Sequence, residues 1–104
     1  MNKYIPDGWC LIKKDKEIYV FGSWSGGYTQ PDRWRRNSGI HSVEEDSCNY
    51  YFIGYSGSEY VCSKKHNHIS MNNYGVLESM LAHKGISKVS EEHIKDNYTV
   101  IKRK

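Results

Sequence analysis

The sequence predicts an α+β fold: a curved antiparallel β-sheet, made of two sequential hairpins and edge strands, with one C-terminal helix packed on a face. Two observations lead to this fold class. Tyrosine and tryptophan occur nine and three times in 104 residues, whereas alanine occurs once and leucine three times, and this balance favours strands over helices. One stretch with helical periodicity follows, over residues 73–84. The length suits a single domain over residues 1–104 with one modest core.

An internal similarity predicts the two hairpins within residues 8–63. Shifting the sequence by 31 positions, from Tyr19 to Tyr50, superimposes two copies of one pattern. Each copy reads as an apolar stretch, a charged turn, an aromatic strand and an aromatic-Ser-Gly loop. The superimposed residues are of similar kinds: Ile12 with Val43, Phe21 with Phe52, Trp24 with Tyr55 and Gly26 with Gly57. We expect the two hairpins to lie side by side in one antiparallel sheet.

Alternation and turn residues place the individual elements. The expected strands are Trp9–Lys14, Glu17–Gly22, Trp34–Arg36, Ile40–Glu44, Asn49–Ile53 and Glu59–Ser63. The helix has an apolar stripe at i, i+1, i+4 and i+5 from Val76, and Gly85 follows it as a stop. Residues 90–94 suit a short helical turn, and residues 98–104 a last strand with a basic tail.

Composition indicates the setting in which the chain works. The chain has no apolar run of 18 residues, so no segment is expected to cross a bilayer. Residues 1–7 lack the apolar core of a secretory signal. The three cysteines form no C-x-x-C pair, so we expect reduced thiols and a cytoplasmic location. The formal charge of +3 permits an acidic partner but falls short of a dedicated duplex-binding protein.

The densest group of metal-ligating residues is Cys62-x3-His66-x-His68. Zinc takes about four such ligands in a tetrahedron, so Cys48 or Cys10 would have to supply the fourth. Two lysines lie inside the motif and oppose a cation, and a strand that ends in a polar loop explains the same residues. We expect no metal, and these residues are the candidates if one binds.

Other chemically suggestive groups lack the context that catalysis needs. Residues 44–46 are acidic and follow His41, but acid–base work or cation binding needs burial or convergence from other segments, and a charged hairpin turn accounts for them. The glycine-rich run over residues 22–27 lacks the Gly-Lys-Ser/Thr of a phosphate loop. We expect no enzymatic activity and no cofactor.

The segment from Trp24 to Asn37 is the main candidate for partner binding, because it interleaves tryptophan, tyrosine and arginine. These residue types often dominate protein interfaces, and they also suit stacked bases and phosphates. If the tryptophans merely close the ends of a small core, the clustering of the arginines is left unexplained. Together with the loop that echoes this segment, the expected partner-binding residues are Trp24, Tyr28, Arg33, Trp34, Arg35, Arg36 and Tyr55.

The order of four segments resembles small, mostly uncharacterised accessory proteins of tailed bacteriophages and prophages. The segments are residues 22–28, 34–40, 43–46 and 55–62, and the resemblance covers roughly residues 8–76. It carries no catalytic signature and transfers no site residue. It implies a context, because early-expressed proteins of this kind often bind and inhibit host factors, including defence systems.

The leading hypothesis is therefore a non-enzymatic binding protein that occludes a site on a host protein or ribonucleoprotein complex. The alternative is a nucleic-acid-binding domain that adds Lys13, Lys14, Lys64, Lys65 and the basic tail to the same residues. A second alternative is a metal-dependent enzyme built on Cys62, His66 and His68.

Overall fold

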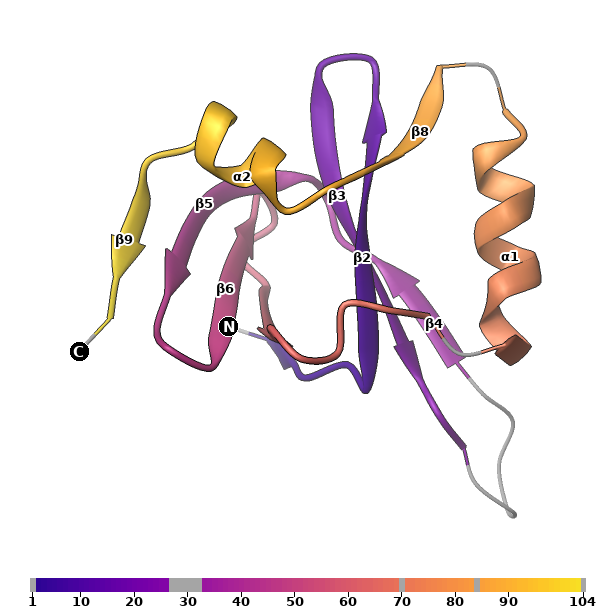
Figure 1. Cartoon of the computed structure of the whole chain (residues 1–104), viewed down its shortest axis with the longest axis horizontal. Helices are drawn as coiled ribbons and strands as arrows, with labels where there is room; N and C mark the ends of the chain where they lie inside the picture. The colour runs from indigo at the N-terminus through magenta and orange to yellow at the C-terminus, as the bar shows by residue number, and fades with distance from the viewer. Residues whose placement is uncertain (1, 27–32, 70, 84, 104) are drawn as a thin grey trace.

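Two β-sheets and two helices make up the fold in the computed structural model, which describes residues 2–26, 33–69, 71–83 and 85–103 (Figure 1). The elements in chain order are β1 (Lys3–Tyr4), β2 (Gly8–Lys14), β3 (Glu17–Trp24), β4 (Arg33–Arg36), β5 (Ile40–Glu45), β6 (Asn49–Gly54), β7 (Glu59–Ser63), α1 (Met71–Leu81), β8 (Ile86–Val89), α2 (Glu92–Asn97) and β9 (Val100–Lys102). The expected strands are all present, with ends within two residues of the expected ones, and the α+β class is confirmed.

The strands divide between two sheets, so the expectation of one antiparallel sheet is wrong. Sheet A has the strand order β1-β7-β6-β5-β9, and sheet B has the order β4-β3-β2-β8. The first hairpin, β2–β3, lies in sheet B and the second, β5–β6, lies in sheet A. Sheet A is also mixed, because β1 runs parallel to β7 and β9 runs parallel to β5. The internal similarity thus marks two hairpins that do not pair with each other.

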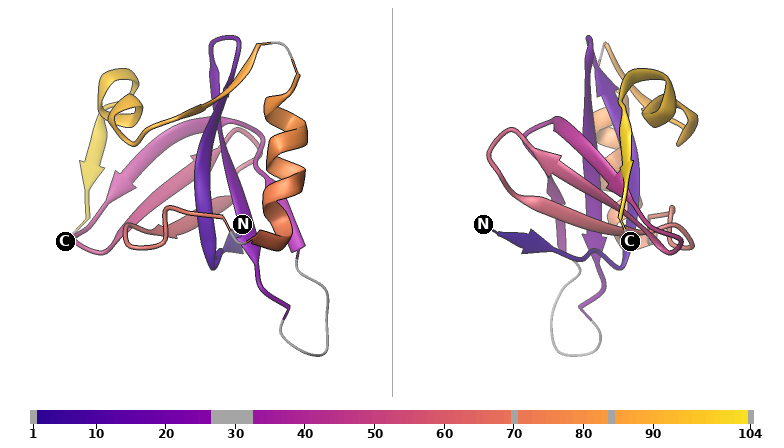
Figure 2. Two further views of the ribbon diagram at one scale, coloured as in Figure 1. Left: turned by 45° about the vertical axis from the view of Figure 1, so that its right-hand side comes forward. Right: turned by 90° about the vertical axis from the view of Figure 1, so that its left-hand side faces the viewer.

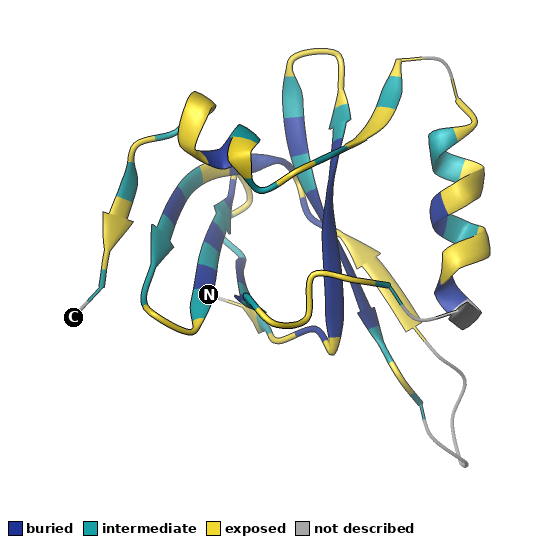
Figure 3. Cartoon of the chain, viewed as in Figure 1, coloured by how far each residue is buried: buried dark blue, intermediate teal, exposed yellow. Residues whose placement is uncertain are grey.

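The layers follow from the alternation of side chains along β2 and β3. One face of sheet B packs on sheet A around Trp9, Leu11, Val20 and Phe52, all of them buried (Figure 3). The opposite face carries Cys10, Ile12 and Phe21, and Leu77 of α1 packs against them. Sheet B therefore lies between sheet A and α1, as Figure 1 shows from left to right.

The helical part differs from the expectation in two ways. The helix predicted at residues 73–84 is α1, Met71–Leu81, so it begins and ends earlier. A second helix, α2, forms where only a short turn was expected, and its Ile94 is fully buried in the core between the sheets. Over the described residues, the structure thus has two helices where the prediction had one C-terminal helix. Burial of Ile94 in the core stabilises α2, because short helices depend on tertiary packing.

The two ends of the described chain lie on opposite edges of sheet A. Lys3 and Tyr4 form the edge strand β1, and residues 100–102 form the other edge strand β9; Figure 2 shows the separation in two further views. Within the described residues, no helix has both the length and the apolar character needed to cross a bilayer.

Candidate partner-binding site

The strand β4 carries the sequence Arg-Trp-Arg-Arg, and all four of its residues are exposed (Figure 3). It is the edge strand of sheet B and pairs antiparallel with β3, with Arg35 opposite Gly22 and Arg33 opposite Trp24. Successive side chains of a strand point to opposite faces. Arg33 and Arg35 therefore lie on the face that carries Trp24, whereas Trp34 and Arg36 lie on the face that packs on α1.

On the α1 side, aromatic rings support the β4 side chains. The Trp34 ring stacks on the buried Phe21 ring, with centroids 5.4 Å apart and an interplanar angle of 7°. The Arg36 guanidinium lies over the Tyr19 ring, 4.6 Å from its centroid. Trp34 remains 43% exposed, so the stack anchors the ring and leaves part of its surface open to solvent.

On the other side of β4, the N-terminal segment supports Arg35. The guanidinium lies 4.6 Å from the centroid of the Tyr4 ring, and Nη1 donates a hydrogen bond to the Tyr4 hydroxyl at 3.1 Å. Tyr4 in turn contacts the buried Tyr60, with centroids 5.0 Å apart. The half-buried Trp24 donates its indole N–H to the carbonyl of Ile5 at 2.9 Å. Cation–π contacts of this kind hold a guanidinium in one orientation.

These side chains enclose a groove of about 660 Å³, which we call the β4 groove. Its lining residues come from β1 and the residue after it, from the ends of β3 and α1, and from β4: Lys3, Tyr4, Ile5, Trp24, Arg33, Trp34, Arg35, Arg36 and Met80. Four of the nine are cationic. The volume lies in the range typical of ligand sites.

The three arginines of β4 are not neutralised by carboxylates among the described residues. Among the described residues, carboxylates pair with Lys3, Lys64 and Arg103. Lys64 pairs with Glu45 at 3.0 Å, and Arg103 pairs with Glu44 at 2.8 Å and with the buried Glu59 at 2.5 Å. Three of the four cations of the β4 groove therefore have no carboxylate partner among the described residues, whereas the fourth, Lys3, lies 3.7 Å from a carboxylate oxygen of Glu59.

The structure gathers some of the predicted binding residues and separates others. Trp24, Arg33, Trp34, Arg35 and Arg36 all line the β4 groove. Tyr55 is exposed but lies elsewhere: its hydroxyl faces Glu17 at 3.5 Å, at the start of β3, whereas Trp24 ends that strand. The eight residues of β3 separate the two ends by roughly 23 Å at the rise of a strand. Tyr28 lies outside the described residues.

Tyr4 and Tyr19 are parts of this site that the sequence analysis missed. Nothing in the local pattern around Tyr4 marks it, because its role depends on the parallel pairing of β1 with β7, far along the chain. The sequence did contain a sign of Tyr19, because Tyr19 and Phe21 lie two residues apart and so share one face of the expected strand. That face turns out to continue onto β4 through the Arg36 contact.

The metal candidates do not assemble into a site. Cys62 is fully buried in the core between the sheets, and burial raises the pKa of its thiol well above the ordinary value. His66 and His68 are exposed in the loop after β7, with ring centroids 6.1 Å apart. Cys10 lies in the other core, where burial raises its pKa to about 11, and Cys48 is exposed. Over the described ranges, no group of three or more His, Cys, Asp or Glu residues is arranged to hold a metal ion.

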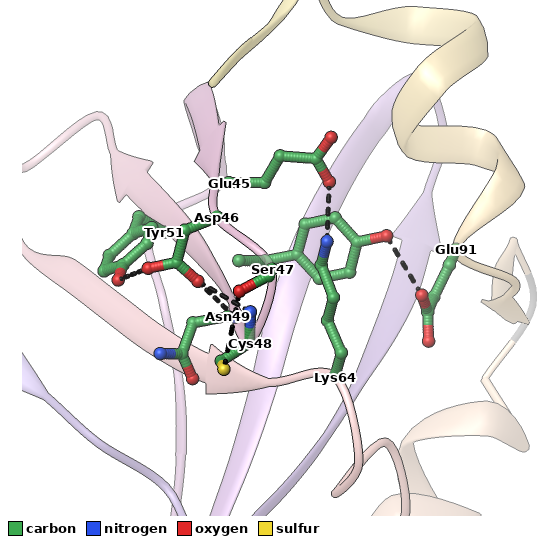
Figure 4. A network of polar contacts seen from close by, with 9 residues as sticks. Glu45, Asp46, Ser47, Cys48, Asn49, Tyr51, Lys64 and Glu91 are labelled. Atoms are coloured by element: carbon green, nitrogen blue, oxygen red, sulfur yellow. Dashed lines mark hydrogen bonds and ion pairs between the residues drawn. The ribbon is translucent and has the colours of Figure 1, made fainter. Parts of the chain in front are cut away.

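The acidic turn between β5 and β6 is occupied by internal contacts (Figure 4). Asp46 accepts hydrogen bonds from the hydroxyl of Tyr51 and from the backbone N–H groups of Cys48 and Asn49, both at 2.8 Å. The Tyr51 hydrogen bond is the main cause of a lowered pKa of Asp46. The ring of His41 faces Tyr55 rather than these carboxylates. The acidic residues thus form the turn of the β5–β6 hairpin, which agrees with the interpretation of the sequence.

Comparisons with protein-family models, with curated proteins and with solved structures give no significant match for this chain.

Proposed function

We propose that this chain is a non-enzymatic binding protein that inhibits a host factor or defence complex by covering a site on it with the β4 groove. The observation that carries the proposal is the Arg-Trp-Arg-Arg strand, which exposes three arginines without ion pairs among the described residues beside an exposed tryptophan. Tryptophan, tyrosine and arginine are the residues that most often dominate binding energy.

Preorganisation supports the same proposal. Arg35 is held over Tyr4, Arg36 over Tyr19, and Trp34 on Phe21. Side chains that are ordered before binding lose less conformational entropy when a partner docks. An acidic patch on the partner would complement the three arginines of the groove, which have no carboxylate partner among the described residues.

A protein partner fits the arrangement of charges better than a nucleic acid does. A strand of nucleic acid needs a continuous basic track along its backbone. Lys13 and Lys14 lie at the opposite end of the β2–β3 hairpin from Trp24, and Lys64 and Arg103 are paired with carboxylates. The basic residues of the nucleic-acid alternative are thus dispersed.

The test is capture of a partner from bacterial lysate, followed by affinity measurement with the purified partner. The surface variant is Arg33→Ala/Trp34→Ala/Arg35→Ala. The matched control is Lys14→Ala/Lys16→Ala/Ile101→Ala, which also removes two exposed cations and one exposed apolar side chain. Loss of one hot spot costs about 2 kcal/mol or more, so we expect the surface variant to bind at least about 30-fold more weakly.

The control variant should capture the same partner with the affinity of the parent chain. Undiminished affinity in a surface variant with a native circular dichroism spectrum would contradict the placement of the site. Binding of oligonucleotides at ~0.1 M salt, falling steeply as salt is raised, would favour the nucleic-acid alternative instead.

A further inference from the structure

The outer edge of β4 has backbone groups that point away from the sheet. Asn37 donates its backbone N–H to the carbonyl of Val20 at 3.0 Å. This hydrogen bond, with the pairing of β3 and β4, shows which residues of β4 direct their backbone N–H and C=O groups toward β3. Because hydrogen-bonding residues alternate in an antiparallel pair, Arg33 and Arg35 turn their backbone groups toward β3. Trp34 and Arg36 therefore turn their N–H and C=O groups outward, and no hydrogen bond to those outward groups is found in the described part of the chain.

The β4 groove straddles this edge. Its lining includes Tyr4 and Trp24 on one face of the strand and Met80 of α1 on the other. The outward N–H and C=O groups therefore lie between two walls that rise on either face of sheet B. A groove of this form fits an extended chain that continues the sheet better than a compact surface.

Charge decides which extended chain fits. A second copy of β4, paired antiparallel about a two-fold axis through its outward backbone groups, would place Trp34 opposite Arg36 and Arg35 opposite the same arginine of the other copy. Like charges directly opposite each other destabilise a strand pair, so the arginine row opposes self-pairing, as charged residues on edge strands commonly do. An acidic strand is the one that the same row attracts.

We propose that β4 binds its partner by strand addition, taking an extended acidic segment of a protein along its outer edge. This proposal rests on the proposed function and names the partner's chemistry. Residues directly opposite on paired strands share a face and interact. Read antiparallel to β4, the segment carries acidic residues opposite Arg36 and Arg35, an apolar residue opposite Trp34, and an acidic residue opposite Arg33.

The probes are synthetic peptides of eight residues with the core Glu-Glu-Val-Glu, or Glu-Val-Glu-Glu for parallel addition. The decisive comparison is between Arg36→Pro and Arg36→Ala in the full chain. Both variants lose the guanidinium, but only proline removes the outward N–H, and an edge position tolerates proline because no ladder hydrogen bond is lost. Binding is followed by titration calorimetry, and folding by the midpoint of thermal unfolding.

We expect the acidic peptide to bind the parent chain, and the Arg36→Ala substitution to lower the affinity for the peptide about tenfold. Arg36→Pro is expected to weaken binding at least about tenfold further, the scale of one lost hydrogen bond. A peptide with lysine in place of glutamate should not bind. A peptide N-methylated at the amides that face β4 tests the same hydrogen bonds from the other side, which keeps the proposal testable if Arg36→Pro does not fold.

Equal binding by Arg36→Pro and Arg36→Ala, with the N-methylated peptide as tight as its parent, would overturn strand addition. So would tighter binding of a twelve-nucleotide thymidine oligomer than of the acidic peptide at ~0.1 M salt. Equal binding in the first comparison leaves the proposed function intact as long as the Arg33→Ala/Trp34→Ala/Arg35→Ala variant loses the captured partner, whereas the oligonucleotide result would favour the nucleic-acid alternative over it. If that variant keeps the partner, the proposed function fails with the inference.

Discussion

Asn37 is a single buried side chain that organises the passage of the chain from sheet B to sheet A. Its Oδ1 accepts hydrogen bonds from the backbone N–H of Val20 at 2.9 Å and of Gly39 at 3.2 Å. Gly39 has φ of +108°, a conformation that favours glycine. Asn37 is only 5% exposed, so both hydrogen bonds are shielded from water and β4 ends in a fixed place beside the groove.

Replacing Asn37 by alanine should lower the free energy of unfolding by about 2–4 kcal/mol. Two backbone N–H groups lose their acceptor, at a cost of about 1–3 kcal/mol each, and removal of the buried Asn37 Nδ2, which has no hydrogen-bond partner among the described residues, offsets part of that cost. Urea denaturation measures the change. The control is Asn97→Ala, because Asn97 is exposed and its amide donates to the His93 carbonyl at the surface; a change within about 0.5 kcal/mol is expected there. Similar small losses in both variants would contradict the role of Asn37.

At the scale of the element, α1 joins a good packing face to a poor helical sequence. Leu77 is fully buried against Cys10 and Phe21, and Val76, Met80 and Leu81 pack around them. Gly75, by contrast, is exposed in the middle of the helix, and a Cβ built there meets nothing within 4 Å. The helix therefore depends on its contact with sheet B rather than on intrinsic propensity.

Gly75→Ala is expected to raise the free energy of unfolding by about 0.5–1 kcal/mol. Alanine has the higher helix propensity and restricts the unfolded chain, and it fits without a clash. Thermal and urea unfolding with a circular dichroism readout test this. The paired variant Gly39→Ala should do the reverse, because a Cβ there would lie 3.1 Å from the Tyr55 ring at a positive φ. Destabilisation by Gly75→Ala would show that α1 is not a regular helix at this point.

The sequence could predict elements better than their assembly. The strands were found because aromatic and β-branched residues alternate over segments such as Glu17–Trp24 and Asn49–Gly54. Their distribution between two sheets was not predictable, because the composition of a hairpin does not say which other hairpin it meets. β1 escaped notice because two residues, Lys3 and Tyr4, give no periodicity, and β8 because its four residues alternate weakly.

The candidate site could also be predicted only in part: residues adjacent in the chain were found, and residues brought in by the assembly of the sheets were not. The arginine and tryptophan residues of β4 were identified from the sequence because they are adjacent in the chain. Tyr4 was not, since it reaches Arg35 only through the β1–β7 pairing. Tyr55 was placed with the site because it echoes Trp24, but equivalent positions of two hairpins need not share a surface when the hairpins lie in different sheets.

For the molecule as a whole, buried tyrosines link stability to alkaline pH. Burial is the main cause that raises the pKa of Tyr50, Tyr60 and Tyr98 to about 12. These residues come from β6, from β7 and from the segment after α2, and all three pack in or against the core between the sheets. The folded state therefore keeps these hydroxyls protonated to a higher pH than the unfolded chain does.

We expect the free energy of unfolding to be insensitive to these tyrosines below pH 10 and to fall between pH 10 and pH 12. In the unfolded chain tyrosine ionises near pH 10, so above that pH the unfolded state binds fewer protons than the folded state, and stability decreases as pH rises. Urea denaturation across this range, with tyrosinate absorbance recorded in parallel, is the measurement. Tyr60→Phe should make the fall shallower, and an unchanged slope in that variant would contradict the assignment.

The parallel pairings at the two borders of sheet A have a practical consequence for attaching anything to this chain. Four inter-strand spacings separate β1 from β9, a distance of roughly 19 Å at ~4.8 Å per spacing. A tag or fused domain joined ahead of Lys3 starts beside the groove wall that Tyr4 forms, whereas one joined after Arg103 leaves from the remote border. Immobilisation on a sensor surface through the carboxyl end therefore keeps the arginine strand accessible, and an amino-terminal fusion would obstruct it.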